Sequence, residues 1–164
     1  MNAILTALIA VLGTLLGSTV THVFQQRAAD RTGRSARQER LRQEQLTAYG
    51  AFAGLLVRFR RALMHHWFCV HEQEDADLEA ELRHRSFELR SETQHALFQL
   101  QLITHDPALV ELAARVFHQV GKIDRAPDRA DVVRRRDETQ ALIDEFVTAA
   151  RAQVQLTLAA GAAD

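Results

Sequence analysis

The side chains best suited to metal binding or acid–base chemistry are concentrated in the octapeptide HHWFCVHE, residues 65–72. On an α-helix His65, Cys69 and Glu72 share one face, because they are spaced at i, i+4 and i+7. Imidazole, thiolate and carboxylate groups are common metal ligands, and three of them leave one coordination position open. A small metal or redox sensor is therefore an alternative function. The same helix must also bury apolar residues, and histidines are favoured near the negative end of a helix, so we assign no metal ligand, cofactor or catalytic residue.

Other charged residues fit the surface of helices better than an active site. Glu88 and Glu92 lie at i and i+4, as many solvated pairs do, and no partner acid is apparent. The triplet 134–136 consists of three arginines, and acidic residues follow it at Glu138, Asp144 and Glu145. This arrangement is typical of a solvated helix face. The sequence has no glycine-rich phosphate loop, HExxH or GxSxG motif, and we predict a protein that is not an enzyme.

Length and composition indicate one domain rich in long helices. The chain has 164 residues with a net charge of −1, one cysteine, seven glycines and two prolines. Near-neutrality gives no general case for a nucleic-acid or acidic partner. A single cysteine excludes an intrachain disulfide framework.

Apolar residues recur at helical spacing in four stretches, and none alternates with period two. The sequence therefore predicts an all-α antiparallel helical bundle over residues 43–158, followed by a frayed tail over 159–164. Breaks are expected near 72–76, 105–106 and 121–128, with Asp106 capping a helix and Gly121 ending it. Arg85 and Thr93 are expected to fill intermediate positions of the second apolar series. The first series, expected to face the core, consists of Leu46, Tyr49, Phe52, Leu56, Phe59, Leu63, Trp67 and Val70.

Residues 1–26 contain no Asp, Glu, Lys or Arg, and this segment is predicted to be a transmembrane anchor. The 22 residues from Ala3 to Phe24 span roughly 33 Å as a helix, enough for a hydrocarbon core of about 30 Å. A cleaved signal peptide would carry its positive charge before the apolar run, and here the charge follows it. A buried helix of a soluble protein is the other alternative.

The arginine-rich segment 27–42 is predicted to be a juxtamembrane stalk. It carries six arginines and two acidic residues, and the positive-inside rule places it in the cytoplasm. We therefore expect a single-pass inner-membrane protein with its N-terminus outside and its bundle cytoplasmic. A helical stalk would align four arginines for contact with anionic lipids, namely Arg27, Arg31, Arg34 and Arg42. A membrane-tethered DNA-binding protein is an alternative, although the stalk offers no aromatic residue for base stacking and we do not expect a nucleic-acid partner.

Small residues line one face of the predicted anchor and include a GxxxG motif. Such residues allow two membrane helices to approach closely. We predict helix–helix packing in the membrane, and hence a homo-oligomer, through Ala10, Gly13, Gly17 and Thr21. The partners we expect are thus the membrane, further copies of the chain and a protein that the sequence does not identify.

Three segments together resemble a known family. They are the opening ALIAVLGTLLGSTVTHVFQQR, the stalk ending ARQERLRQEQLTAYGAFAG, and the later stretch DPALV, residues 106–110. The chain is similar to small bacterial membrane proteins described as KilB-like, after a factor in plasmid spread during conjugation. The resemblance implies a membrane-associated accessory role in plasmid spread between neighbouring cells, and it does not imply an enzyme.

Overall fold

The computed structural model describes residues 36–37, 39–73 and 75–162, with side chains described up to residue 156. The chain divides into two units, Met1–Arg40 and Leu41–Asp164. The predicted anchor and most of the stalk lie outside the described residues, and so do Ala10, Gly13, Gly17, Thr21, Arg27, Arg31 and Arg34. Within the described ranges, no helix combines the length and the apolar character that a bilayer span requires.

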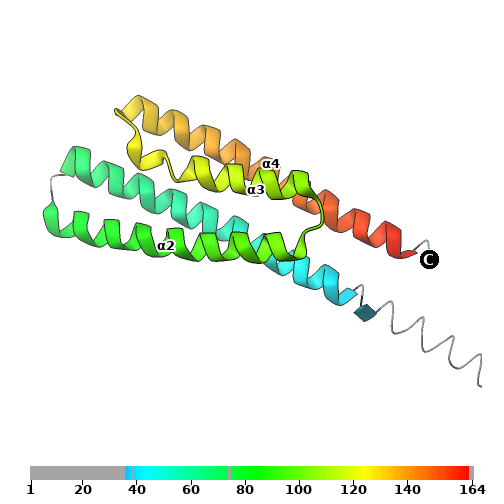
Figure 1. Ribbon diagram of the computed structural model, residues 1–164. Helices are drawn as coiled ribbons and strands as arrows, with labels where there is room; N and C mark the ends of the chain where they lie inside the picture. The colour runs from blue at the N-terminus through cyan, green and yellow to red at the C-terminus, as the bar shows by residue number, and fades with distance from the viewer. Residues whose placement is uncertain (1–35, 38, 74, 163–164) are drawn as a thin grey trace, which may run out of the picture. The chain divides into compact units, whose positions relative to one another are not determined.

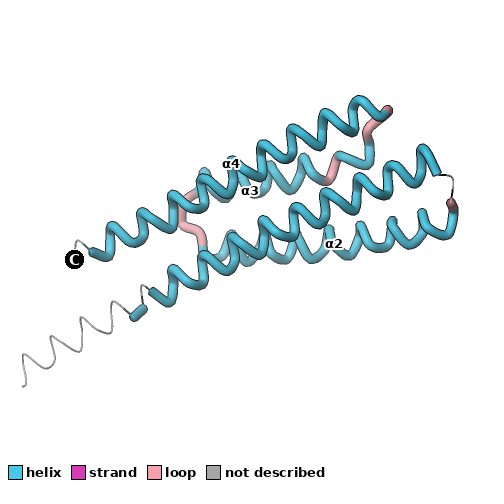
Figure 2. The backbone as a smooth tube through the Cα atoms, turned by 180° about the vertical axis from the view of Figure 1, so that it is seen from behind, coloured by secondary structure: helices cyan, strands magenta, loops and turns pink. Residues whose placement is uncertain are grey.

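The described part of the second unit is formed by four α-helices, which run alternately in opposite directions (Figures 1 and 2). The described part of the chain contains no strand, so the predicted all-α fold is confirmed. The first helix covers residues 39–68 and continues into a π-helical turn, η1 (Cys69–Gln73). It is followed by α2 (Ala76–Ile103), α3 (Pro107–Val120), the 3₁₀ turn η2 (Ile123–Arg125) and α4 (Arg129–Ala162). Helix α4 therefore includes residues 159–162 of the segment that we predicted to fray.

An aspartate precedes each of the last three helices and fixes where it begins. The carboxylate of Asp75 accepts a hydrogen bond from the backbone N–H of Leu78 at 3.0 Å. Asp106 accepts one from Ala108 at 2.9 Å, ahead of a proline in the first turn. Asp128 accepts one from the backbone N–H of Asp131, in the first turn of α4, at 2.8 Å. Each carboxylate satisfies a backbone donor that the helix leaves unpaired, which explains why the breaks lie where the sequence predicts them.

Aromatic side chains of the first helix form the centre of the core together with α4. Phe52 and Phe146 are completely buried, and their rings pack edge to face with centroids 5.2 Å apart. Tyr49 packs against the same Phe146 ring at 6.5 Å. Six core positions expected from the sequence are therefore correct, because all six side chains are buried. They are Tyr49, Phe52, Leu56, Phe59, Leu63 and Trp67.

Three core expectations are wrong. Leu46 and Val70 are each 40% exposed, because Leu46 lies on the rim of a surface groove and Val70 falls in the π-helical turn, where the register shifts. The third wrong expectation is Arg85, which was expected to fill a position of the apolar series on α2. The buried residue there is its neighbour Ser86. Arg85 instead points outward and pairs with Glu88 at 2.9 Å, since burial of a guanidinium is costly.

Gly121 ends α3 as expected, but not through a left-handed backbone. Its φ is −66° and its ψ is 1°, values that any residue adopts. The space beside it is what matters, because a Cβ at Gly121 would lie 3.1 Å from Nη1 of Arg90. The glycine therefore allows a guanidinium from α2 to approach the end of α3.

Candidate functional site

The structure does not bring His65, Cys69 and Glu72 together. Cys69 is buried, and its Sγ donates to the carbonyl oxygen of Asp75 at 3.7 Å. The Glu72 carboxylate lies 3.4 Å from the guanidinium of Arg129. The π-helical turn starts at Cys69, so the i, i+4, i+7 alignment of a regular α-helix is lost. No group of three potential ligands is present in the ranges that the structure describes, so the contacts of these residues give no support to the sensor alternative.

The aromatic residues of the same region join the first helix to the connection before α4. Trp67 Nε1 donates to the buried carbonyl oxygen of Ala126 at 2.8 Å. The His71 ring stacks on the indole at 4.2 Å, and its Nδ1 lies 2.9 Å from the carbonyl oxygen of Trp67. Trp67 and His71 therefore hold this end of the bundle together.

The glutamates at 88 and 92 are held in surface ion pairs. Glu88 contacts Arg85 at 2.9 Å and His84 at 3.4 Å, and Glu92 lies 3.8 Å from Arg58. Both carboxylates thus lie in exposed ion pairs, the solvated arrangement that their spacing favours.

The arginine triplet of α4 is largely neutralised by its own helix. Arg134 pairs with Asp131 and with Glu138, the latter at 2.6 Å. Arg135 reaches Asp131 at 2.7 Å, and Arg136 reaches Asp137 at 2.8 Å. Burial by itself would raise the pKa of Asp131, but the hydrogen bonds from the two arginines outweigh it and hold that pKa below its usual value.

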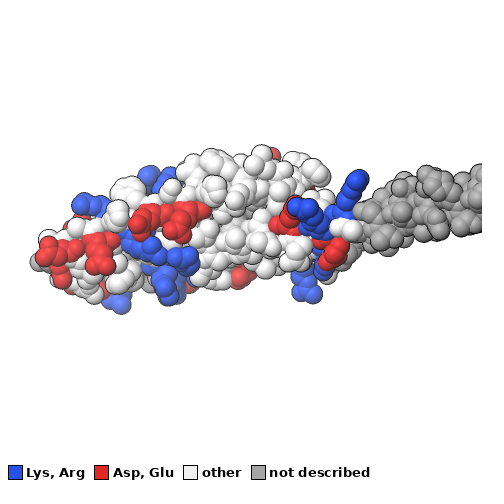
Figure 3. Space-filling view, turned by 90° about the horizontal axis from the view of Figure 1, so that it is seen from below, with Lys and Arg blue, Asp and Glu red and all other residues white. Residues whose placement is uncertain are grey.

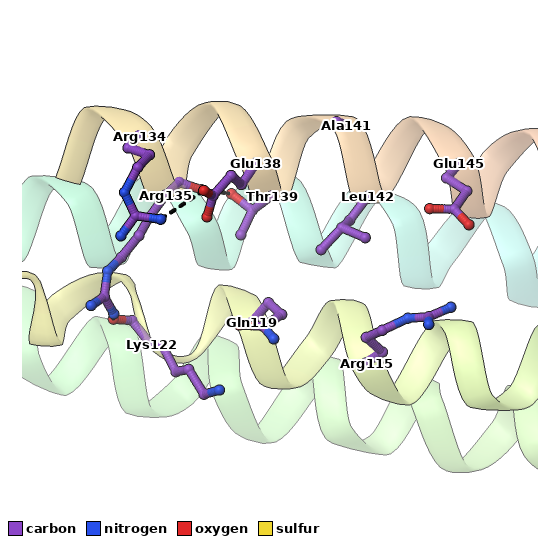
Figure 4. Close-up of a pocket in the computed structure, with 10 residues that line it drawn as sticks. All are labelled: Arg115, Gln119, Lys122, Arg134, Arg135, Glu138, Thr139, Ala141, Leu142 and Glu145. Carbon is purple, nitrogen blue, oxygen red and sulfur yellow. Dashed lines mark hydrogen bonds and ion pairs between the residues drawn. The ribbon is translucent and has the colours of Figure 1, made fainter. Parts of the chain in front are cut away.

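A groove of about 640 Å³ lies between α3 and α4 and has a mixed-charge lining (Figure 4). Arg115, Gln119 and Lys122 come from the α3 side, and Glu138 and Glu145 come from α4. Cations and carboxylates are thus both present along it. Figure 3 shows the same mixture on one face of the bundle, where red and blue side chains adjoin and a largely uncharged region lies between the charged ends.

A second groove, between the first helix and α4, is mostly apolar and is called here the apolar groove. Its volume is about 510 Å³. Small residues open it, and a Cβ at Gly50 would meet nothing within 4 Å. Apolar side chains on its rim reach solvent, with Leu46 40% and Val147 47% exposed. Its lining consists of Arg42, Leu46, Tyr49, Gly50, Ala53, Phe146, Val147, Ala150, Arg151, Val154 and Gln155.

Buried polar contacts fix the wall of the apolar groove. The Tyr49 hydroxyl lies 3.0 Å from Oγ1 of Thr104, and Gln45 Nε2 donates to the carbonyl oxygen of Ile103 at 3.4 Å. Burial raises the pKa of Tyr49, although the hydrogen bond with Thr104 opposes that effect. The first helix is thereby attached to the end of α2. An exposed apolar groove of this kind can bind an amphipathic helix or the apolar surface of another protein.

A third cavity, of about 330 Å³, lies where the first helix, α2 and the connection between α3 and α4 meet. Its lining includes Arg83, Arg90 and Arg125, with one carboxylate from Asp124. We call it the basic pocket. Neither this pocket nor the apolar groove is predicted from the sequence, because each combines residues that are far apart in the chain.

Arg42 is the one predicted lipid-contact residue that the structure describes. It lines the apolar groove, and its contact with lipid stays a prediction.

Comparison with known proteins identifies one family. Residues 46–154 match the family model described as KilB plasmid transfer protein. The resemblance inferred from the sequence is thus confirmed, and the matched range includes nearly all of the bundle. No curated protein and no solved structure matches the chain significantly.

Proposed function

Because this chain belongs to the KilB plasmid transfer protein family, we propose that it acts in plasmid transfer as a membrane-tethered, non-enzymatic assembly protein. In this proposal the anchor holds the protein at the inner membrane, and the bundle associates with a second copy through the apolar groove. The observation that carries the proposal is the groove itself, a recess between the first helix and α4 whose rim exposes apolar side chains.

A second copy is the occupant that fits the apolar groove best. The groove has both the recess, at Gly50 and Ala53, and the exposed apolar side chains, at Leu46 and Val147. A two-fold interface pairs the same patch on both subunits, so the exposed residues of one copy would enter the recess of the other. The small-residue face of the predicted anchor favours the same pairing.

Tethering would strengthen this association without any new contact. The groove begins at Arg42, the last residue of the predicted stalk. Two anchored chains would therefore present their grooves at a similar distance along the chain from the membrane. The effective concentration of one groove for the other then rises well above that of the free protein.

Cysteine cross-linking in native membranes tests the interface. The one native cysteine is buried, so a cysteine introduced at the surface is the reactive one. Val147→Cys, on the groove rim, is expected to give a disulfide-linked dimer under mild oxidation. Val57→Cys is the matched control, because Val57 is 43% exposed and does not line the groove. Equal dimer from both variants, or none from Val147→Cys, would contradict the proposed interface.

Plasmid transfer and membrane fractionation test the role. Val147→Glu is expected to lower transfer frequency, because a charge in an apolar interface is costly to desolvate, while Val57→Glu leaves it unchanged. The full-length chain is expected in the membrane fraction, and a chain lacking residues 1–26 in the soluble fraction. Intact full-length protein in the soluble fraction of native cells would defeat the tethering part of the proposal.

A further inference from the structure

The basic pocket has the composition of a binding site for a phosphorylated small molecule. Two buried apolar residues of the first helix, Phe59 and Leu63, belong to its lining. Three guanidinium groups, from Arg83, Arg90 and Arg125, also line it. A volume of about 330 Å³ falls at the lower end of the range for small-ligand sites.

The arginines of the pocket are only weakly neutralised by the protein. Arg83 pairs with Glu79, but at 3.9 Å. Neither Arg90 nor Arg125 has a carboxylate within ion-pair distance in the described part of the chain. The arginine triplet of α4, in contrast, is fully paired. Asp124 is the single carboxylate in the lining, so the lining carries two more positive than negative charges, without counting His66.

Arg90 is already held at the pocket. Its guanidinium carbon lies 5.6 Å from the centre of the Phe117 ring, and Nη1 occupies the space that the missing side chain of Gly121 leaves. These contacts place the guanidinium beside the pocket, and its exposed end can still adjust to an anion. Its planar donors match a phosphate group in two parallel hydrogen bonds.

Two further residues of the pocket are suited to contact a ligand. Nε2 of His66 is buried and makes no hydrogen bond within the residues described, although buried polar atoms are nearly always paired. Phe87 belongs to the lining and is 66% exposed. A large exposed ring beside cationic side chains offers a surface on which an aromatic base can stack.

We propose that the basic pocket, formed by His66, Arg83, Phe87, Arg90 and Arg125, binds a nucleoside phosphate. The phosphate group lies against the guanidinium groups and the base lies on Phe87. This site is separate from the apolar groove and does not depend on the proposed assembly.

Calorimetric titration of the full-length protein in phosphatidylcholine nanodiscs, which carry no net charge, tests the proposal. AMP, inorganic phosphate, adenosine and succinate are the probes. AMP is expected to bind most tightly, phosphate more weakly, and adenosine and succinate not measurably. Equal binding of adenosine and AMP would overturn the phosphate assignment. Succinate binding as tight as that of phosphate would favour a carboxylate ligand such as an acidic peptide and would also overturn it. Phosphate binding as tight as that of AMP would overturn the part assigned to the base.

Charge-removing variants locate the site. Arg90→Gln and Arg125→Gln are each expected to weaken AMP binding about tenfold or more, the loss of a charge-assisted hydrogen bond. Arg125→Gln guards against a packing defect, because Arg90 also covers Phe117. Arg115→Gln, an exposed arginine in the α3–α4 groove, is the matched control and is expected to leave binding unchanged.

Asp124→Asn is expected to tighten AMP binding, because it removes the one negative charge of the lining. Equal weakening by all three arginine variants would overturn the site, and so would the absence of AMP binding to the wild type. Val147→Glu is expected to retain AMP binding, so failure of the groove proposal is distinguishable from failure of this one.

Discussion

Replacing Tyr49 by phenylalanine is expected to lower the free energy of unfolding by about 1–3 kcal/mol, the cost of leaving a buried polar group unpaired. The hydroxyl lies 3.0 Å from Oγ1 of Thr104, and the two residues are only 4% and 7% exposed. This hydrogen bond joins the first helix to the residue that ends α2. The substitution removes one oxygen and leaves the Thr104 hydroxyl without its partner across the helices.

A double-mutant cycle isolates the hydrogen bond. Thr104→Val is expected to cost a similar amount, since it leaves the Tyr49 hydroxyl unpaired. The double variant leaves neither group behind, so its cost should fall short of the sum of the single costs by about 1 kcal/mol. Urea unfolding of the full-length protein in mild detergent, followed by circular dichroism, gives the three values. Thr47→Val is the control, because Thr47 is exposed and bonds only to the carbonyl oxygen of Gln43 in its own helix. Single costs that add to within about 0.3 kcal/mol would refute the reasoning.

The pH dependence of stability in alkaline solution tests the burial of Tyr49 independently of the double-mutant cycle. Burial raises the pKa of Tyr49 in the folded protein, so folding favours the neutral phenol. That contribution is fully present below the unfolded pKa of about 10 and is lost as pH rises through the folded pKa. Wild-type stability should therefore decline more steeply above about pH 10 than the stability of Tyr49→Phe. Parallel declines would contradict the burial argument.

Three further predictions concern the other end of the bundle. Trp67→Phe removes the donor to the carbonyl oxygen of Ala126 and should cost about 1–3 kcal/mol in urea unfolding; unchanged stability would contradict a role for that bond. Gly121→Ala should change stability by less than about 1 kcal/mol, because its φ of −66° suits alanine and the flexible end of Arg90 can move away. A loss above about 2 kcal/mol would show that Arg90 cannot adjust. Asp131→Asn should make the free energy of unfolding fall less steeply as the solution is acidified. The pKa of Asp131 is lowered in the folded protein, so its carboxylate stabilises the fold above the unfolded pKa, and this stabilisation is lost as pH falls through the folded pKa. An equal loss of stability with falling pH in the variant and the wild type would contradict this prediction.

The helices were predictable because their signals are local. Apolar residues repeat every three or four positions, and each of three aspartates pairs with a backbone N–H two or three residues later. Such contacts depend only on residues within one turn. The bounds of α3 follow from Asp106, Pro107 and Gly121 alone.

The sequence predictions that failed concern residues whose surroundings are set by packing between helices. Cys69 appeared to share a face with His65 and Glu72, but the π-helical turn that begins there was not visible in the spacing. Leu46 has the spacing of a core residue, yet it is 40% exposed on the rim of the apolar groove, whose lining includes the small residues Gly50, Ala53 and Ala150. Periodicity locates a helix face but does not say whether a neighbouring helix covers all of it.

The basic pocket left a partial signal in the sequence. Arg83, Ser86, Phe87 and Arg90 recur at i, i+3, i+4 and i+7 and so lie on one face of α2. A face with two arginines and a phenylalanine interrupts the apolar stripe and could have been marked as unusual. The remaining part could not be inferred, because Arg125 comes from a connection that reaches the pocket only after the bundle has folded.

The family match and the two surfaces bear on the same segment of the chain. Residues 46–154 contain the whole basic pocket and nearly all of the apolar groove, whereas the predicted anchor, residues 1–26, precedes the match. The family match, and with it the suggested role in plasmid transfer, therefore rests on residues of the bundle. In the proposed mechanism the anchor changes the effective concentration of the bundle and leaves its contacts unchanged. A chain whose residues 1–26 are exchanged for an unrelated membrane span of the same orientation should then retain much of its transfer activity, since only the pairing favoured by the small-residue face of the native span is lost. Complete loss of activity in that chimaera, with normal membrane insertion, would show that pairing depends on the native span rather than on the apolar groove.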